Sequence, residues 1–348
     1  MTDSVRVAFV VRLDGGNMHR RARALCAHLP PPFVGEVVPP TFREKTSADV
    51  FYVIDANRDC FAAGAAARAR GRRVVFELGD PQADLFRTQG RGAHEVTAGA
   101  IVDRLVARFA TAVAVRGRRL AEFLRVRVPW VELPDGVDTD VFRPADAREL
   151  RTSLGVQDAL VVGLVGSLKK PRPPRTSYGS EVVDAIAQLH DPSVIGLIVG
   201  AGSGLEALRR RADEAGVSER IVFAGAVPHE EIQRYVNAMD VCVSTQTDDR
   251  VGQSRTTAKL PEYLACDRFV LASDVGAAHD VLPEEMRVRY DGASDPSYPS
   301  RLAQRIAPLA RRRDELRAGV GTRAIAEERY AYPVLAERLA NFLGESVC

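Results

Sequence analysis

Short runs of β-branched residues alternate with longer helical segments along most of this chain, and this alternation limits the fold more than any other feature. The runs RVAFVV (6–11), DVFYVI (49–54) and ALVVGLVGS (159–167) are almost wholly apolar, as strands are when helices cover both faces of a sheet. Segments with apolar residues at helical spacing, such as 18–29 and 95–110, follow or precede them. The pattern predicts an α/β fold with doubly wound parallel sheets.

The length of the chain indicates more than one domain. Its 348 residues exceed the roughly 250–300 at which a single core stops growing. We expect two doubly wound, Rossmann-like domains at residues 1–144 and 145–326, with 327–348 forming a C-terminal helix that packs back on the first domain. Further strands are expected at 72–78, 111–115, 128–134, 194–200, 220–225, 240–245 and 268–273, and an arginine-rich helix near 300–318.

Composition excludes several classes of protein. The hydrophobic fraction of 46% and the charged fraction of 27% are those of a globular protein, and the net charge of +2 gives no reason to expect nucleic acid. Residues 1–145 hold 22 Lys and Arg against 17 Asp and Glu, which permits an anionic acceptor, peripheral contact with a membrane, or an ordinary solvated surface. We expect a monomer or homodimer.

The apolar runs and the cysteines indicate where in the cell the protein is expected. No stretch approaches 18 uncharged apolar residues, and Arg6 and Arg12 interrupt the first apolar run, so neither a transmembrane segment nor a signal peptide is expected. The five cysteines are never spaced as metal ligands or redox pairs. We therefore expect a cytoplasmic protein with free thiols and no metal.

Glycine-rich and basic loops follow several of the expected strands, where open α/β sheets bind ligands. Gly15 and Gly16 follow the first strand, and Gly200 and Gly202 follow the strand at 194–200. Glycines let a backbone approach a phosphate closely, although a plain tight turn explains Gly15 and Gly16 equally well. The loop GSLKKPRPPRTSYG (166–179) suits a phosphate clamp through its cations Lys169, Lys170, Arg172 and Arg175.

The stretch VGQSRTTAKLPEYLACDRFVLASDVG (251–276) is the most informative. It holds Lys259, one of only four lysines among 48 basic residues. Thr256 or Thr257 is expected to cap the helix that follows, leaving backbone N–H groups and Arg255 near an anion. Glu262 lies three residues after Lys259, where a carboxylate can accept hydrogen bonds from a ribose diol, or simply form a surface ion pair.

Three segments carry a resemblance to a known family. The motif KLPEYLA (259–265) followed by RFVLAS and Gly276, the segment LPDGVDTDVFRP (133–144), and IVGAGSG with RIVFAGAVPHEEIQRYVNAMDVCVS (198–244) together resemble retaining glycosyltransferases of the GT-B fold, family 4. The resemblance is strong over 130–290 and weaker before it, where GGNMHRRARAL resembles the family's first glycine-rich loop. It implies two Rossmann-like domains facing across a cleft.

The resemblance also implies roles for residues. Glu262 would hold the ribose hydroxyls of a nucleotide sugar. Ala226 and Val227 would lie under the base, and Gly15 and Gly16 would approach the donor phosphates or the acceptor. Lys259 and the backbone of four residues would face the diphosphate or sugar: Ser254, Arg255, Thr256 and Thr257.

Other positions depart from the family's pattern. The diphosphate-binding arginine and lysine are replaced by Ser167 and Tyr178, so one of the cations Lys169, Lys170, Arg172 and Arg175 would substitute. Gly79 stands where many members have a histidine, and Asp80, which follows it, would accept the acceptor's proton, orient a sugar, or merely cap a turn. The catalytic candidates are therefore Lys259, Asp80 and Arg175.

The function implied is transfer of a sugar from a nucleoside diphosphate sugar to an acceptor hydroxyl with retention at the anomeric carbon. The donor base would be that of UDP, GDP or dTDP, no further cofactor is required, and the acceptor is expected to be a small metabolite. Three alternatives stay open: a catalytically silent nucleotide-sugar-binding protein, a transferase acting on a lipid-linked acceptor, and an epimerase of the same architecture, although the T-E-R-P-E stretch of that epimerase group is missing.

Overall fold

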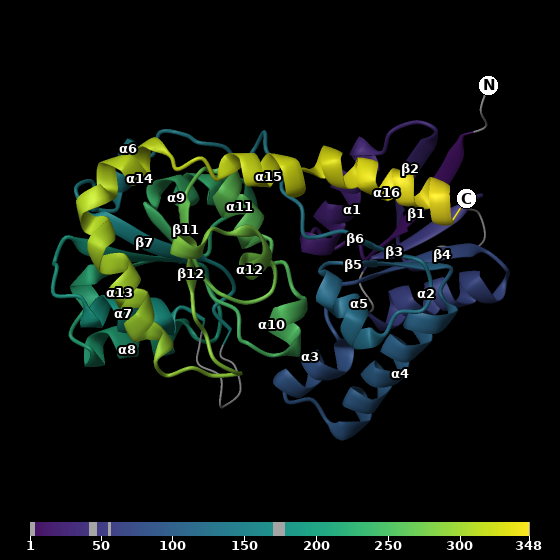
Figure 1. Ribbon diagram of the computed structural model, residues 1–348, viewed down its shortest axis with the longest axis horizontal. Helices are drawn as coiled ribbons and strands as arrows, with labels where there is room; N and C mark the ends of the chain where they lie inside the picture. The colour runs from purple at the N-terminus through teal and green to yellow at the C-terminus, as the bar shows by residue number, and fades with distance from the viewer. Residues whose placement is uncertain (1–3, 42–46, 55–56, 170–177, 348) are drawn as a thin grey trace. The chain divides into compact units, whose positions relative to one another are not determined.

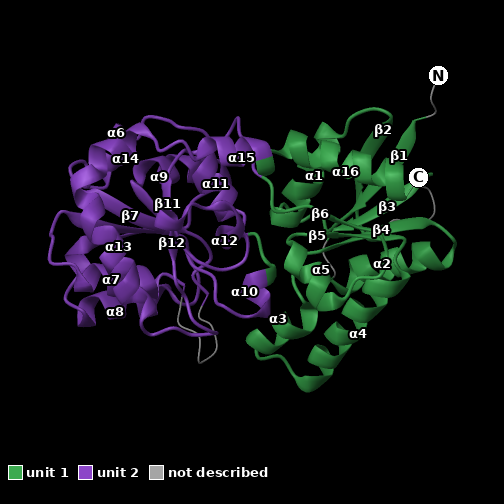
Figure 2. Cartoon of the chain, in the orientation of Figure 1, with its two compact units in different colours: residues 1–136, 254–256, 329–348 green, residues 137–253, 257–328 purple. Residues whose placement is uncertain are grey.

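The computed structural model describes residues 4–41, 47–54, 57–169 and 178–347. The chain divides into two compact units (Figure 2): unit 1 is 1–136, 254–256 and 329–348, and unit 2 is 137–253 and 257–328. The division after residue 136 falls eight residues before the expected boundary. The reason is that this linker bonds to unit 2: Asn237 donates to the carbonyl of Arg143 and accepts from the amide of Ala145, both at 3.0 Å.

Unit 1 is built on a parallel sheet whose described strands number six, in the order β2-β1-β3-β4-β5-β6. Its strands are β1 Val5–Val10, β2 Phe33–Val38, β3 Val50–Ile54, β4 Arg73–Leu78, β5 Ala112–Val115 and β6 Trp130–Glu132. Its helices are α1 Asn17–His28, α2 Arg58–Ala69, α3 Gln82–Thr88, α4 Ala93–Phe109, α5 Arg118–Leu124 and α16 Tyr332–Ser346 (Figure 1).

Helices cover both faces of this sheet. On one face Leu25 of α1 and Leu335 and Leu339 of α16 pack against β1 and β3 in a single buried cluster, with α16 lying beside α1 (Figure 1). On the other face α2, α4 and α5 complete a second buried cluster. The C-terminal helix is therefore part of the core of unit 1, because its leucines complete one side of that core.

Unit 2 has a second parallel sheet of six described strands, in the order β12-β11-β10-β7-β8-β9. Its strands are β7 Leu160–Val165, β8 Val194–Val199, β9 Ile221–Gly225, β10 Val241–Ser244, β11 Phe269–Ser273 and β12 Arg287–Val288. Its helices are α6 Arg148–Ser153, α7 Ser180–Gln188, α8 Leu205–Glu214, α9 Ile232–Ala238, α10 Arg250–Ser254, α11 Lys259–Ala265, α12 Ala277–Val281, α13 Tyr298–Ile306, α14 Arg313–Ala318 and α15 Arg323–Arg329, of which Ser254 and Arg329 count with unit 1.

The expected α/β class with two parallel, doubly wound sheets is confirmed. Every residue of β3 and β7 is buried, as the β-branched runs predict. Six elements were not expected: β2, α3, α6, α10, α15 and β12. The expected arginine-rich helix is three shorter pieces, α13, a 3₁₀ turn at 307–312 and α14. Pro308 stands at the start of that turn, where it cannot donate to a continuing α-helical ladder.

None of the helices described here is both long enough and apolar enough to span a bilayer.

Candidate functional site

The loops that follow β7, β8 and β9 meet at the carboxyl edge of the unit 2 sheet. The amide of Leu168 donates to the carbonyl of Ala201 at 3.0 Å, and the amide of Gly200 donates to the carbonyl of Gly225 at 2.8 Å. A side chain at Gly202 would come within 2.9 Å of the amide nitrogen of Lys169. The edge thus brings together Gly200, Gly202 and Lys169 with Gly225, the residue before Ala226 and Val227.

Gly200 shows why this edge needs glycine. Its φ of +143° lies outside the region that L side chains adopt, and an added Cβ would lie 1.9 Å from the carbonyl oxygen of Gly166. Backbone from two loops is therefore packed more closely than any side chain permits. Three other predicted phosphate ligands, Lys170, Arg172 and Arg175, lie outside the described residues.

Helix α11 carries Lys259 and Glu262 one turn apart and brings Lys259 to this edge. The ammonium of Lys259 lies 3.8 Å from the centre of the Tyr178 ring, and a Cβ at Gly166 would be 3.5 Å from that nitrogen. Glu262 is 8% exposed, and its amide donates to the carbonyl of Ala258 at 3.2 Å. A carboxylate and an ammonium one turn apart can thus act on different parts of one ligand.

The expected helix cap is wrong. Helix α11 begins at Lys259 with Ala258 at its N-cap, and no side chain caps it. Thr257 contributes its carbonyl oxygen, which accepts from the amide of Leu260 at 3.0 Å. The Thr256 hydroxyl instead donates to the carbonyl of Arg116 at 2.9 Å. A tertiary hydrogen bond has replaced the local one that the sequence suggested.

Residues 254–256, predicted to face the donor, belong to unit 1. The Arg255 guanidinium donates to both carboxylate oxygens of Asp80, at 2.5 and 3.2 Å. Ser254 is fully buried. The structure therefore places the side chains of Arg255 and Thr256 on unit 1 partners, and it places the predicted catalytic carboxylate of Asp80 in an ion pair.

A buried charge network fills the carboxyl edge of the unit 1 sheet. Arg21, 2% exposed, donates from Nε to both oxygens of Glu77 at 2.9 and 3.0 Å. Its other nitrogens donate to the carbonyls of Leu133 and Pro134, and the Tyr52 hydroxyl donates to Glu77 at 2.8 Å. Burial alone would raise the pKa of Glu77, but the attraction of Arg21 and Arg116 outweighs it and lowers that pKa. Glu77 is therefore held as a carboxylate.

Arg116 extends this network. It lies 3.3 Å from a carboxylate oxygen of Glu77 and 3.4 Å from one of Asp135. A Cβ at Gly79 would be 3.0 Å from its guanidinium carbon, so the guanidinium occupies the space beside Gly79. Sequence reasoning missed this network. One signal was available: Glu77 is the sole acidic residue of the otherwise apolar strand core VVFEL (74–78).

The loop after β1 holds the predicted Gly15 and Gly16. Gly15 has a φ of +71° and donates its amide to Nδ1 of His19 at 3.1 Å. Because Nδ1 accepts, the proton of the neutral ring is on Nε2. The Gly16 amide donates to Asp14 at 2.8 Å, and Gly16 precedes α1 as its N-cap.

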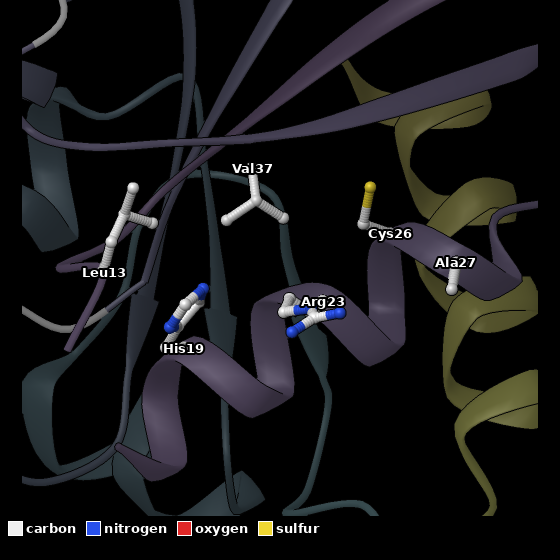
Figure 3. A pocket seen from close by; sticks show the side chains of 6 residues that line it. All are labelled: Leu13, His19, Arg23, Cys26, Ala27 and Val37. Atoms are coloured by element: carbon white, nitrogen blue, oxygen red, sulfur yellow. The ribbon is translucent and has the colours of Figure 1, made fainter. Parts of the chain in front are cut away.

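A pocket of about 360 Å³ opens beside this loop in unit 1 (Figure 3). Figure 3 shows the His19 and Arg23 side chains on α1 below, with Val37 of β2 above them and Leu13 at one end. Cys26 and Ala27 complete the lining. The pocket combines two basic or hydrogen-bonding groups with apolar walls.

Across the described ranges, no three His, Cys, Asp or Glu side chains are grouped in a way that could hold a metal ion.

Part of the chain matches a known family. Residues 159–311 match the family described as glycosyl transferases group 1. The D-inositol 3-phosphate glycosyltransferase of Mycobacterium ulcerans is 32% identical over 165 residues, which are 46% of this chain and 32% of that protein. The corresponding Mycobacterium bovis protein is 34% identical over 147 residues, 40% of this chain and 28% of its own length. The chain thus spans about a third of the length of these curated relatives.

Solved structures resemble the whole chain. Sucrose-phosphate synthase from Thermosynechococcus elongatus superposes with a TM-score of 0.75 at 17% identity, covering 98% of both chains. Anabaena HepE in complex with UDP and glucose gives a TM-score of 0.73 at 17% identity, covering 98% of this chain and 99% of that one. At such identities the likeness concerns the fold.

Proposed function

We propose that this chain, which has the GT-B fold and belongs over residues 159–311 to the glycosyl transferases group 1 family, transfers a sugar from a nucleoside diphosphate sugar to an acceptor hydroxyl. One observation carries the proposal: α11 presents Lys259 at the strand ends where glycine-rich loops bring backbone close together, and it carries the buried residue Glu262 one turn further on. A nucleoside diphosphate needs both a cation and an acceptor of hydroxyl hydrogen bonds.

Each group has a role in this proposal. Glu262 accepts hydrogen bonds from the two ribose hydroxyls, and Ala226 and Val227 lie beside the base. Lys259 neutralises the charge that develops on the diphosphate as the bond between the anomeric carbon and the phosphate oxygen breaks. Lys169 and its neighbours outside the described residues add cations. The acceptor oxygen bonds to the anomeric carbon and its proton passes to the departing diphosphate, with retention of configuration and without a metal.

UDP is the first donor nucleotide to test, since HepE is known in complex with UDP and with UDP-glucose. For the acceptor we favour a small metabolite held by unit 1. The pocket beside Gly15 suits one with both a polar or anionic group and an apolar part, since Arg23 and His19 lie opposite Leu13 and Val37. A cytoplasmic reaction and a monomer or homodimer complete the proposal.

The experiment is a titration of UDP, GDP and dTDP, each followed by the melting temperature of the whole chain. A ligand at 100 times its Kd adds about 2.7 kcal/mol to the stability of the unit that binds it. That corresponds to a rise of about 5–10 °C for a unit of this size. Glu262→Gln should abolish the rise, because the neutral amide cannot replace the carboxylate acceptor.

The matched control is Glu315→Gln, which changes an exposed glutamate of the same unit that pairs with Arg312 at 2.6 Å. This variant should keep the full rise. If none of the three nucleotides stabilises the wild type, unit 2 has no such donor site and the proposal fails.

A second function, nucleotide-sugar binding without transfer, is favoured by the ion pair between Arg255 and Asp80, which engages the carboxylate expected to act on the acceptor. Donor consumption separates the two functions. The transferase hydrolyses or transfers its bound donor sugar during incubation, whereas a silent binding protein returns it intact.

A further inference from the structure

The strand order of unit 2 selects one place on its carboxyl edge. From β7 the chain proceeds to β8 and β9 on one side, whereas β10, β11 and β12 extend the sheet on the other side. The chain therefore goes on from β7 and from β10 to opposite sides of the sheet, so the ends of these two strands form a topological switch point. In open α/β sheets ligands bind in the crevice outside the strand ends at such a point.

Tyr178 spans this crevice. It lies in the connection between β7 and α7, and its hydroxyl donates to the carbonyl of Val243 on β10 at 3.4 Å. A Cβ at Gly166, the residue after β7, would be 3.0 Å from its ring. The ring is thus fixed between the ends of the two central strands.

A second tyrosine, Tyr263 of α11, lies close to Tyr178. The Tyr263 hydroxyl accepts the amide hydrogen of Val165 at 2.7 Å. Burial raises the pKa of both phenols well above their ordinary value, so both rings are neutral at physiological pH. What Tyr178 offers a cation is therefore the negative face of its ring.

Lys259 uses that face, with its ammonium 3.8 Å from the ring centre. A nearby acid, Glu181 of α7, accepts the amide hydrogen of Gly179 at 2.9 Å. Burial raises the pKa of Glu181 more than the field of Lys259 lowers it. The contact with the Tyr178 ring therefore places this ammonium beside the end of β7.

We propose that Tyr178 is a positioning residue: its ring seats the ammonium of Lys259 at the crevice between β7 and β10, where that ammonium binds the sugar-linked phosphate of the donor. The proposal rests on the proposed function, and adds a residue that acts through Lys259. It also states which phosphate Lys259 binds.

The test measures the Kd of UDP and of UMP by calorimetry on the whole chain and its variants, with GDP and GMP or dTDP and dTMP used if those bind instead. Lys259→Met should weaken UDP binding about tenfold or more. Tyr178→Leu should weaken it about five- to thirtyfold, the usual range for losing a desolvated cation–π contact. Both variants should bind UMP within about twofold of the wild type, because UMP lacks the second phosphate.

The double variant tests whether Tyr178 acts through Lys259. Tyr178→Leu combined with Lys259→Met should bind UDP as weakly as Lys259→Met alone, since the ring then has no ammonium to seat. Effects that multiply would overturn the proposal and leave Tyr178 with a purely structural role.

A graded series covers the case in which Tyr178→Leu fails to fold. Tyr178→Phe should keep UDP affinity within about twofold. Mono-, di- and trifluorinated phenylalanine at residue 178 should then lower it stepwise, since each fluorine weakens the negative ring face with little change in shape. An affinity that does not follow the fluorine count would contradict the proposal.

The control is Phe86→Leu, which removes the ring under Arg91 in unit 1, a cation–ring contact of 4.4 Å. It should leave UDP affinity unchanged. If the wild type binds no nucleoside diphosphate, the proposed function has failed. If UDP binds, but the variants weaken UMP as much as UDP or the two single effects multiply in the double variant, only this inference has failed.

Discussion

At the carboxyl edge of unit 1, arginine and carboxylate side chains bind one another, whereas at the same edge of unit 2 glycines bring backbone together and Lys259 lies on an aromatic ring. Arg21 and Arg116 of unit 1 surround the buried Glu77. Arg116 also pairs with Asp135, so the network sets two arginines against two carboxylates, and the excess of 22 basic over 17 acidic residues in 1–145 comes from residues outside it.

The largest expected effect comes from breaking the unit 1 network. Glu77→Ala leaves Arg21 buried without its carboxylate, and we expect the free energy of unfolding of unit 1 to fall by about 3–5 kcal/mol, measured by urea denaturation. Because the folded-state pKa of Glu77 is lowered, its contribution is present above the unfolded pKa and is lost as the pH falls through the folded pKa.

UDP affinity is the control for this variant, because unit 2 does not contain the network. It should remain within about twofold of the wild type under conditions in which unit 1 is folded. An equal loss in UDP affinity would mean that the two edges do not differ in role.

The next largest effect on stability is expected when one glycine at the edge of each sheet is replaced by alanine. Gly200→Ala places a Cβ 1.9 Å from the Gly166 carbonyl oxygen at a φ of +143°, and we expect a loss of about 3 kcal/mol together with loss of UDP binding. Gly15→Ala meets nothing within 4 Å at a φ of +71°, so only the left-handed penalty of about 1 kcal/mol applies. Melting temperatures that fall equally would show that close backbone approach does not distinguish the edges.

A buried carboxyl without an arginine sharpens the comparison. Asp103 of α4 is 5% exposed, and its Oδ1 has no hydrogen-bond partner in the described part of the chain. Burial raises its pKa to about 6. Since the folded form holds its proton more tightly than the unfolded form, stability should fall as the pH rises from about 4 to about 6, the opposite slope to that of Glu77.

Asp103→Asn should remove that slope and raise the free energy of unfolding at pH 7.5 by about 2 kcal/mol, within the roughly 3 kcal/mol that a shift of this size represents. Denaturation curves at several pH values measure it. A variant that is less stable at every pH would show that the carboxylate form contributes to the fold.

The smallest effect is expected at the ion pair between Arg255 and Asp80. Arg255 and Asp80 are partly exposed, so Arg255→Met should cost less than about 1 kcal/mol. Nucleotide affinity should change by less than about twofold, because the guanidinium is engaged in unit 1. A larger loss of UDP affinity would restore Arg255 to the donor site, where the sequence placed it.

The sequence was most informative where each residue's role is local. The apolar runs of β3 and β7 predict buried strands, and the rarity of lysine draws attention to Lys259. Strand β2 was missed because Val34 and Glu36 are exposed and Gly35 interrupts its pattern. Tyr178 and the Arg21–Glu77 pair were missed because their partners lie 81 and 56 residues away, a separation at which no local pattern operates.

Helix α16 has a consequence for how the protein is made. Its residues Leu335, Leu339 and Leu343 complete the same buried cluster as Val7 and Phe9 of β1. Strand β1 is therefore translated more than 300 residues before its core partner in α16. At a translation rate of about 5–20 residues per second, the apolar face that α16 packs against lacks this helix for roughly 15–70 seconds. Unit 2, whose sheet ends at Val288, can fold during that interval. It can therefore complete its core before unit 1 does, although most of it is translated later.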